Sequence, residues 1–359
     1  MNRLFATGIA FVLCTTGFAQ VRKYSNEFLN IGVSARALGM SNAVVASVND
    51  VTSGYWNPAG LNRITCDLQV GFMHSEYFAG IAKYDYGSIS LPARDKSGRM
   101  ALSIIRLGID DIHNTLFLIE PDGSINYDNV TSFSAADYAF IFSYAQPIKW
   151  QNLHLGGNAK VIHRRAGNFA RAWGFGFDFG AQWEKKRWRL GAMARDITTT
   201  FNAWSVNFTE EEQHILEITG NIIPDNDLEL TVPRLILAAA WQHDLTERVS
   251  FISEVNVDMT TDGQRNVLIP TKLFSFEPHL GVEFGYADVI FIRGGIGNIQ
   301  RHLAETSTDQ VTTLQFNLGV GLKLKSFVID YAYTDIGDQS QSLYSHVFSL
   351  RADITRKTP

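Results

Sequence analysis

The chain of 359 residues carries a formal net charge of −5, and 19% of its residues are charged while 12% are aromatic. So small a charge gives no support for nucleic-acid binding. The charged fraction lies below the roughly one quarter usual for soluble domains, and beyond residue 20 no run of about 18 apolar residues is long enough for a membrane-spanning helix. Two classes remain, namely a large secreted β protein and an outer-membrane β-barrel.

Residues 1–19 have the pattern of a secretory signal peptide. Arg3 precedes an apolar run over residues 4–13, and the small-x-small pattern that ends at Ala19 predicts cleavage after this residue. Loss of Arg3 changes the formal net charge from −5 to −6. A lipoprotein signal at Cys14 is disfavoured because a leucine precedes it, where a small residue is required. Cys66 is then the remaining cysteine of the mature chain, so we expect no intramolecular disulfide.

After a polar lead-in over residues 20–30, residues 31–61 do not alternate as a strand does. Small residues crowd the first half of this stretch and allow one backbone to approach another closely. The sequence YWNPAGL ends it, and its proline fixes φ and removes a hydrogen-bond donor. This composition predicts a compact plug inside a barrel. The plug motif comprises Gly32, Ser34, Arg36, Gly39, Asp50, Trp56, Asn57, Pro58 and Gly60.

The rest of the chain alternates apolar and polar residues in segments of about ten residues, as transmembrane β-strands do. Residues 171–184 are the clearest case, because Trp173, Phe175 and the following odd-numbered positions are apolar while the even-numbered ones are glycine or polar. In a barrel one of these faces meets lipid and the other meets the lumen. The candidate strands are residues 66–76, 82–92, 99–108, 133–147, 152–163, 171–184, 187–196, 233–244, 247–258, 276–286, 289–298, 312–324, 326–335 and 343–354.

The connections between these segments alternate in length after the second strand. Outer-membrane barrels have short periplasmic turns and longer external loops. Short links lie at 93–98, 148–151, 185–186, 245–246, 287–288 and Lys325, whereas long ones lie at 109–132, 197–232, 259–275 and 299–311, with intermediate ones at 164–170 and 336–342. A soluble sandwich has no reason to sort its loops in this way.

We therefore predict an all-β protein, a transmembrane antiparallel β-barrel of about fourteen strands with an N-terminal plug. Its parts are a signal peptide (1–19), a lead-in with the lumen plug (20–61), the barrel (62–354) and a tail (355–359). The expected location is the outer membrane, with both termini periplasmic and lipid around the barrel.

Two predicted external loops are too apolar for free surface loops. One carries Leu116, Phe117 and Ile119, and the other carries Ile215, Leu216 and Ile218. The second set follows Thr209-Glu210-Glu211-Glu212, a capping-box start that predicts a short amphipathic helix within residues 205–224. Two interpretations stay open, because these residues can bury one another over the barrel mouth or form a contact surface for another protein.

No group of residues predicts catalysis, a cofactor or a metal site. The nine histidines are scattered without the helical spacing of metal ligands, and the glycine-rich stretch 294–297 lies within a predicted strand instead of before a helix. Lumen-facing charges of both signs, among them Lys160, Glu254 and Arg293, are expected to pair across the lumen and to hold the plug. We therefore predict no enzyme activity.

The stretch GVSARALGMSNAVVASVND, followed by YWNPAGL, resembles the N-terminal signature of the PorV/PorQ family within the FadL-like group of outer-membrane barrels. The likeness covers roughly residues 28–61 and is carried by Gly32, Ser34, Ala35, Arg36, Leu38, Gly39, Met40, Ala43, Asp50, Tyr55, Trp56, Asn57, Pro58, Ala59 and Gly60. The remainder of the chain fits that family by length and by strand number.

The resemblance implies a non-enzymatic barrel of the type IX secretion and sorting machinery. Its external loops would bind secreted cargo through the cargo's C-terminal signal domain, or subunits of the translocon or the attachment complex. The alternative is a FadL-like transporter of hydrophobic small molecules, which needs an apolar pocket between plug and wall. Apolar loop residues that line a cavity would favour transport, and apolar residues that project from the rim would favour protein docking.

Overall fold

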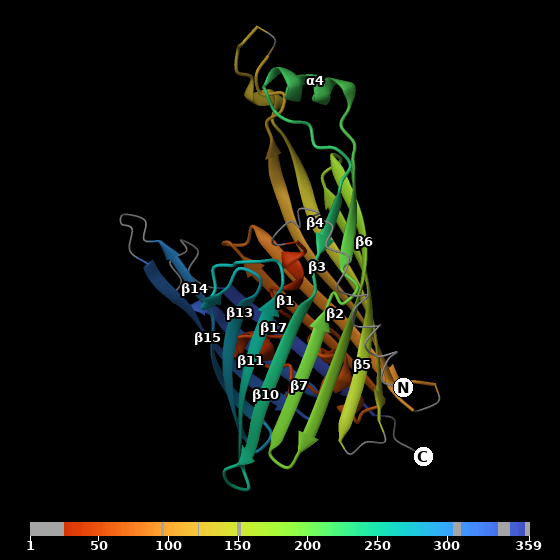
Figure 1. Ribbon diagram of the computed structural model, residues 1–359, viewed down its shortest axis with the longest axis vertical. Coiled ribbons are helices and arrows are strands. Elements are labelled where there is room, and N and C mark those ends of the chain that lie inside the picture. Colours follow the sequence, from red (N-terminus) through yellow and green to blue (C-terminus); the bar gives the residue numbers. More distant parts are fainter. Residues whose placement is uncertain are drawn as a thin grey trace, which may run out of the picture.

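The computed structural model describes residues 25–94, 97–120, 122–148, 152–303, 310–336 and 345–355. Within these ranges the chain forms one antiparallel sheet that closes on itself, because the first strand, β1, pairs with both the second and the last. Figure 1 shows the strands as a tall, tilted wall that rises higher on one side. The predicted signal peptide and most of the predicted C-terminal tail lie outside the described residues.

The strands follow the sequence around the barrel. They are β1 (Leu68–Tyr77), β2 (Ala82–Pro92), β3 (Arg99–Asn114), β4 (Thr131–Pro147), β5 (Leu153–Ala166), β6 (Ala170–Lys185), β7 (Trp188–Arg195), β8 (Thr200–Val206), β9 (Leu228–Thr231), β10 (Arg234–Asp244), β11 (Val249–Thr260), β12 (Ile269–Pro270), β13 (Ser275–Tyr286), β14 (Ile290–Leu303), β15 (Gln310–Leu324), β16 (Phe327–Ile336) and β17 (Ser345–Ile354).

Three of these strands in the described chain are not separate crossings. β8 continues β7 and β9 leads into β10, while the short β12 only adds to the edge of β13. The barrel wall therefore has fourteen strands, as the alternating pattern predicts. In the described residues no helix is long and apolar enough to cross a membrane.

The loop predicted at 197–232 is too long, because this stretch contains two strands, β8 and β9, besides the predicted helix, which is α4 (Glu210–Ile218). β7 ends at Arg195, and Asp196 and Thr199 then take left-handed φ angles of 54° and 60°. This kink turns the chain, after which β8 pairs with β6. The loop predicted at 109–132 is also too long, since β3 runs to Asn114.

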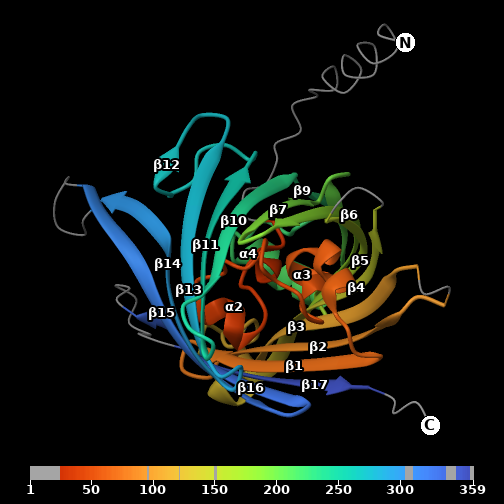
Figure 2. The ribbon, with the colours of Figure 1, turned by 90° about the horizontal axis from the view of Figure 1, so that it is seen from below.

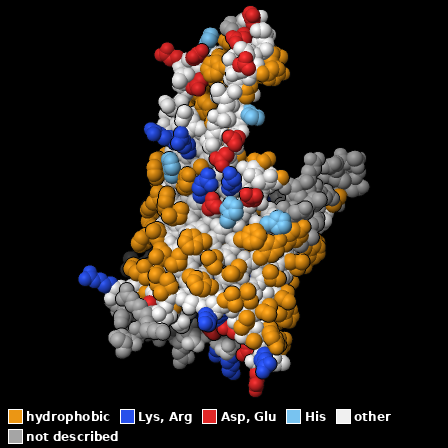
Figure 3. Space-filling view, turned by 180° about the vertical axis from the view of Figure 1, so that it is seen from behind, with side chains coloured by type: hydrophobic (Ala, Val, Ile, Leu, Met, Phe, Trp, Pro, Cys, Tyr) orange, Lys and Arg blue, Asp and Glu red, His pale blue; other side chains and the backbone are white. Residues whose placement is uncertain are grey.

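The lipid-facing and lumen-facing sides of the wall are chemically distinct. On β6 the exposed side chains run from Trp173 to Phe179 at odd positions, and the even positions between them are buried. Figure 3 shows the consequence as a broad hydrophobic band on the face of the barrel in view, bounded toward the raised side by histidine and charged side chains. Such a band of outward apolar side chains is typical of transmembrane β-barrels.

The N-terminal segment, residues 25–64, lies inside the ring of strands (Figure 2). It contains four short helices, η1 (Glu27–Leu29), α2 (Ala35–Gly39), α3 (Ser53–Trp56) and η2 (Pro58–Arg63). Helical turns satisfy their backbone groups locally, so the segment needs no strand partner. Most of its residues are buried, and they form the larger hydrophobic cluster of the protein together with lumen-facing wall residues such as Met73 and Met193.

Candidate functional site

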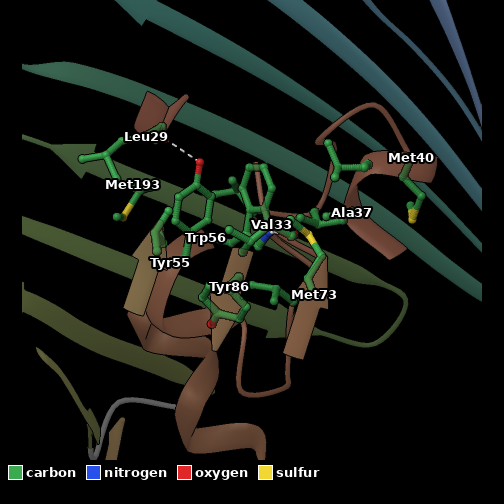
Figure 4. Packing of buried hydrophobic residues seen from close by; sticks show 14 of the residues in the cluster. Leu29, Val33, Ala37, Met40, Tyr55, Trp56, Met73, Tyr86 and Met193 are labelled. Carbon is green, nitrogen blue, oxygen red and sulfur yellow. Dashed lines mark hydrogen bonds between the residues drawn. The ribbon is translucent and has the colours of Figure 1, made fainter. Parts of the chain in front are cut away.

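The aromatic pair Tyr55–Trp56 fixes the fold of the N-terminal segment. The Tyr55 hydroxyl donates to the carbonyl of Leu29 at 2.5 Å, and Trp56 Nε1 donates to the carbonyl of Val33 at 2.9 Å. Figure 4 shows both rings packed among Met73, Tyr86 and Met193 of the wall. The YWNPAGL sequence therefore ties the two ends of the segment together in the lumen.

Asn57 and Pro58 begin the last helix of the segment. The Asn57 side chain accepts from the amide of Ala59 at 3.2 Å, as an N-cap residue does. Its Nδ2 donates to the carbonyl of Val45, and also to that of Ala181 on β6, at 3.0 Å each. One side chain thus caps a helix and bonds the segment to the wall.

Buried ion pairs help to join the segment to the wall. Arg36 Nε lies 2.9 Å from Glu283 on β13, and Asp50 Oδ2 lies 2.8 Å from Arg351 Nη1 on β17. Burial by itself would raise the pKa of Asp50, but Arg351 and Arg36, with hydrogen bonds from Thr52, hold it below its ordinary value of 3.8. Asp50 is therefore a charged anchor of the segment at neutral pH.

Wall side chains also bond directly to the backbone of the segment. The Glu254 carboxylate accepts from the amides of Ala46 and Ser47 at 2.7 and 3.1 Å. Gln182 donates to the carbonyls of Val45 and Val48 at 3.0 Å each. The prediction that inward polar and charged residues hold this segment is confirmed by these contacts, since each one satisfies a buried backbone group.

Lumen-facing glycines allow the segment to touch the wall backbone. A Cβ placed on Gly295 would lie 2.4 Å from the carbonyl carbon of Met40, and one on Gly281 would lie 2.6 Å from the Met40 carbonyl oxygen. On the segment itself, a Cβ on Gly39 would lie 2.9 Å from Cα of Gly319. The other wall glycines within such distances of the segment are Gly71, Gly156, Gly180 and Gly191. Sequence reasoning missed these glycines, although they interrupt otherwise regular strands.

The remaining motif residues allow the backbone conformations and close backbone contacts that the segment contains. Gly32 and Ser34 take positive φ angles of 102° and 79°, a region that glycine adopts without strain. A Cβ on Gly60 would lie 2.4 Å from the carbonyl oxygen of Val48, so this glycine permits a close chain crossing. The structure thus brings all nine predicted plug-motif residues into one buried segment.

A cavity of about 510 Å³ lies between the segment and the wall, at the end of the barrel that carries the long loops. Its lining is mixed. Apolar groups come from Ile31, Leu38, Val45, Trp56, Ile236 and Val267, and polar ones include Asn30, Arg234, Asn256, Asp258, Asn298 and Asn317. The charges are largely neutralised in the wall, since Arg234 bonds Asn30 at 2.7 Å and lies 3.7 Å from Asp258.

A separate hollow of about 290 Å³ lies at the short-turn end, lined among others by Glu184, Arg189 and Gln242. The two hollows have no lining residue in common. Between them lie the contacts of Asn57, Gln182 and Glu254 described above. The N-terminal segment therefore lies between the two hollows.

The second candidate site is a raised arm on one side of the rim (Figure 1). We define the arm as residues 109–120, 122–135, 164–171 and 200–231. Its base is well packed, because Phe169 contacts Phe133 and Phe208 with ring centroids 5.2 and 5.6 Å apart. Arg164 lies between Asp137 and Glu229 at 2.9 and 3.2 Å.

The predicted helix in this arm is confirmed. α4 begins after Thr209, whose side chain accepts from the amide of Glu212 while the Glu212 carboxylate accepts from the amide of Thr209. This capping box is the one expected from the sequence.

The six predicted partner-binding residues divide into two groups. Ile119 and Ile218 are 64% and 69% exposed, whereas Leu116, Phe117, Ile215 and Leu216 are half-buried. Ile222, in the same apolar loop as α4, is also exposed, and sequence reasoning missed two further exposed apolar residues of the tip, namely Ile125 and Tyr127. In Figure 3 the tip carries hydrophobic and acidic side chains together. None of the six lines the large cavity.

No family model and no curated protein matches this chain. Solved structures do match. The CymD monoaromatic hydrocarbon channel superposes with a TM-score of 0.57 at 12% identity, over 91% of this chain and 98% of that one. The toluene transporter TodX of P. putida gives 0.54 at 12% identity, with 91% and 99% coverage. The toluene transporter TbuX of Ralstonia pickettii gives 0.51 at 12% identity, with 90% and 98% coverage.

At these identities the similarity establishes the fold. The chain is a closed antiparallel β-barrel with the architecture of these channels and transporters. The printed names of the three proteins are those of hydrocarbon channels or toluene transporters. They name no secretion system, so the finer resemblance of residues 28–61 to the PorV/PorQ family has no support among them.

Proposed function

We propose that this protein is an outer-membrane channel for small molecules that have an apolar body and a polar or charged end. The cavity between the N-terminal segment and the wall carries this proposal. It is large enough for a small ligand at about 510 Å³, it lies on the long-loop side, and its lining combines both chemistries.

The mixed lining narrows the ligand class that the fold suggests. Hydrocarbon channels share the architecture, but a pure hydrocarbon makes no use of the polar groups that Arg234, Asn256 and Asn298 present in the lining. A molecule with one carboxylate can place it beside Arg234 and rest its apolar part on Ile236 and Trp56. Passage then requires displacement of residues 31–61, which we propose act as the plug of the channel.

Uptake into proteoliposomes tests the proposal. The probe is p-toluate, and gluconate is a control solute of equal charge that is polar throughout. We expect p-toluate to enter faster than gluconate, and Arg234→Gln to slow p-toluate several-fold. Arg248→Gln, in the turn between β10 and β11 at the opposite end of the barrel, is the matched control; it lines neither hollow and should have no effect. Equal entry of p-toluate into empty liposomes would refute the channel.

A second candidate function is protein docking at the arm, and the exposed tip favours it. Ile119 and Ile218 project from the rim and do not line a cavity. Exposed apolar groups on a well-packed support are typical of protein contact sites. With the signature in residues 28–61, this supports the proposal that the barrel binds secreted cargo or subunits of a type IX translocon or attachment complex.

Purification of the tagged protein from outer membranes, with quantitative mass spectrometry, tests docking. The expected partners are a large translocon barrel, attachment-complex subunits, or secreted proteins with a shared C-terminal domain. Ile119→Ser with Ile218→Ser should reduce their recovery, whereas Leu273→Ser changes an equally exposed residue outside the arm and should not. Recovery of the barrel alone would count against docking.

A further inference from the structure

Two exposed arginines lie directly opposite each other on the lipid-facing side of β5 and β6. Arg165 pairs with Arg171 in the strand register, and Arg171 pairs in turn with Ser205 on β8. The three residues form a row across three neighbouring strands, and all of them are exposed. Like charges opposite each other destabilise a strand pair unless an anion neutralises them.

The height of this row above the membrane follows from the strand geometry. Trp183 and Trp173 lie ten residues apart on the outward face of β6, which is about 33 Å along the strand and about 25 Å along the membrane normal at a tilt of about 40°. This spacing equals the apolar band of an outer-membrane barrel, so the two tryptophans mark its margins. His163 packs against Trp173 with the two ring centroids 4.2 Å apart and the rings tilted by 31°.

Arg165 and Arg171 stand two residue pairs beyond His163 and Trp173, on the long-loop side. This step places them about 5 Å outside the apolar band, at the level of the lipid head groups. Their side chains therefore reach charged groups of lipids and not the acyl chains.

A hollow of about 600 Å³ surrounds this row. The polar residues in its lining are His163, Arg165, Asn168, Arg171, Ser205 and Asn207, and its described lining includes no aspartate or glutamate. Arg165 donates from Nε to the carbonyl of Gly167 at 2.7 Å and from Nη2 to Asn168 at 2.9 Å, which fixes its guanidinium and leaves further N–H groups free. The lining is thus a set of hydrogen-bond donors with positive charge.

Two outward cations on β2 and β3, at the same end of the barrel, are neutralised by acids. Arg106 lies 3.2 Å from Asp85, and Lys83 lies 3.1 Å from Asp110. In the described part of the chain no acidic side chain lies within ion-pair distance of Arg171. The difference between the two sides of the barrel indicates that the counter-ion of the arginine row comes from outside the chain.

We infer that Arg165 and Arg171 bind the phosphate-bearing head group of a lipid in the membrane leaflet on the long-loop side. Guanidinium groups match phosphate oxygens in a bidentate geometry. One phosphate between the two arginines removes their mutual repulsion, while Trp173 packs beside the lipid at the margin of the band. The same contact anchors the base of the arm at a fixed height. This site is independent of the channel and docking proposals.

Native mass spectrometry of the detergent-purified full chain tests the site. The probes are bisphosphorylated lipid A, the same lipid without its phosphates, and inorganic phosphate. We expect the phosphorylated lipid to bind, and Arg165→Gln with Arg171→Gln to weaken it by about tenfold or more. The matched control is Arg106→Gln, an arginine at the same level with an acidic partner, which should change binding less than about twofold.

The folded state of each variant is checked by its resistance to unfolding in detergent at room temperature. Equal binding of the lipid with and without phosphates would overturn the proposal, as would unchanged binding by a folded double variant. Displacement of the lipid by an equal concentration of inorganic phosphate would assign the site to free phosphate and overturn the lipid as its source.

Discussion

Substitution of Gly295 by alanine tests whether the N-terminal segment closes the lumen. A Cβ at this position would lie 2.4 Å from the carbonyl carbon of Met40 and 2.6 Å from the amide nitrogen of Ser41. Both are backbone atoms, so the segment has to move away from the wall by about 1 Å to restore ordinary contact. Overpacking of this kind costs about 1–3 kcal/mol.

This cost arises only while the segment lies against the wall. When the segment moves away, position 295 faces open lumen and the added Cβ meets no backbone atom. A cost of about 2 kcal/mol raises the released population about thirtyfold. Release should open a path between the two hollows. We therefore expect Gly295→Ala to raise the permeability of proteoliposomes to small neutral sugars by up to about thirtyfold. The permeability of a barrel without the segment in its lumen sets the upper limit.

Gly294→Ala is a matched control on the neighbouring residue. A Cβ there would meet Val282 and Leu318 at 3.8 and 3.9 Å, which are ordinary contacts on the lipid face. This variant should keep the wild-type permeability. Equal permeability of both variants and the wild type, with the barrel folded, would refute the role of residues 31–61 as a closing plug.

Three further predictions concern single side chains. Arg351 and Arg36 hold the pKa of Asp50 below 3.8, so the ion pair of Asp50 stabilises the segment in the lumen above that pH and is lost as the pH falls through the lowered pKa. Asp50→Asn should therefore raise the permeability at neutral pH. Acid below pH 3.8 should raise the permeability of the wild type. Thr209→Ala should lower amide-exchange protection in α4 about fivefold, since an N-cap contributes about 1 kcal/mol. Lys160→Met leaves Asp178 buried without its cation, and should destabilise the barrel by about 3–5 kcal/mol in thermal unfolding.

Each of these predictions has a control. Acid should change the permeability of Asp50→Asn less than that of the wild type, and an equal response would exclude Asp50 as the titrating group. His214→Ala, which removes an exposed side chain from α4, should leave exchange protection unchanged. Lys323→Met breaks an exposed pair with Asp288 and should cost less than about 1 kcal/mol.

The sequence by itself determined the fourteen-strand wall. A strand exposes its two faces to different solvents, so Trp173, Phe175 and Phe177 had to alternate with small or polar residues, and this local periodicity is readable without a structure. The same is true of the cap of α4, which involves residues only three positions apart. The kink at Asp196 hid the equally regular β8, because a break in φ separates two alternating runs.

Tertiary structure alone decided the contacts between distant parts of the chain. Gly295 lies against Met40, and Asp50 forms an ion pair with Arg351, although hundreds of residues separate the members of each pair in the sequence. No local sequence pattern indicates which wall glycine the segment contacts. Closure of the sheet likewise set Arg165 beside Arg171 without an acidic neighbour and raised the arm above the rim. The periodicity of a strand determines which of its side chains face the lumen and which face the lipid. Which residues of distant segments these side chains contact is determined only when the barrel closes.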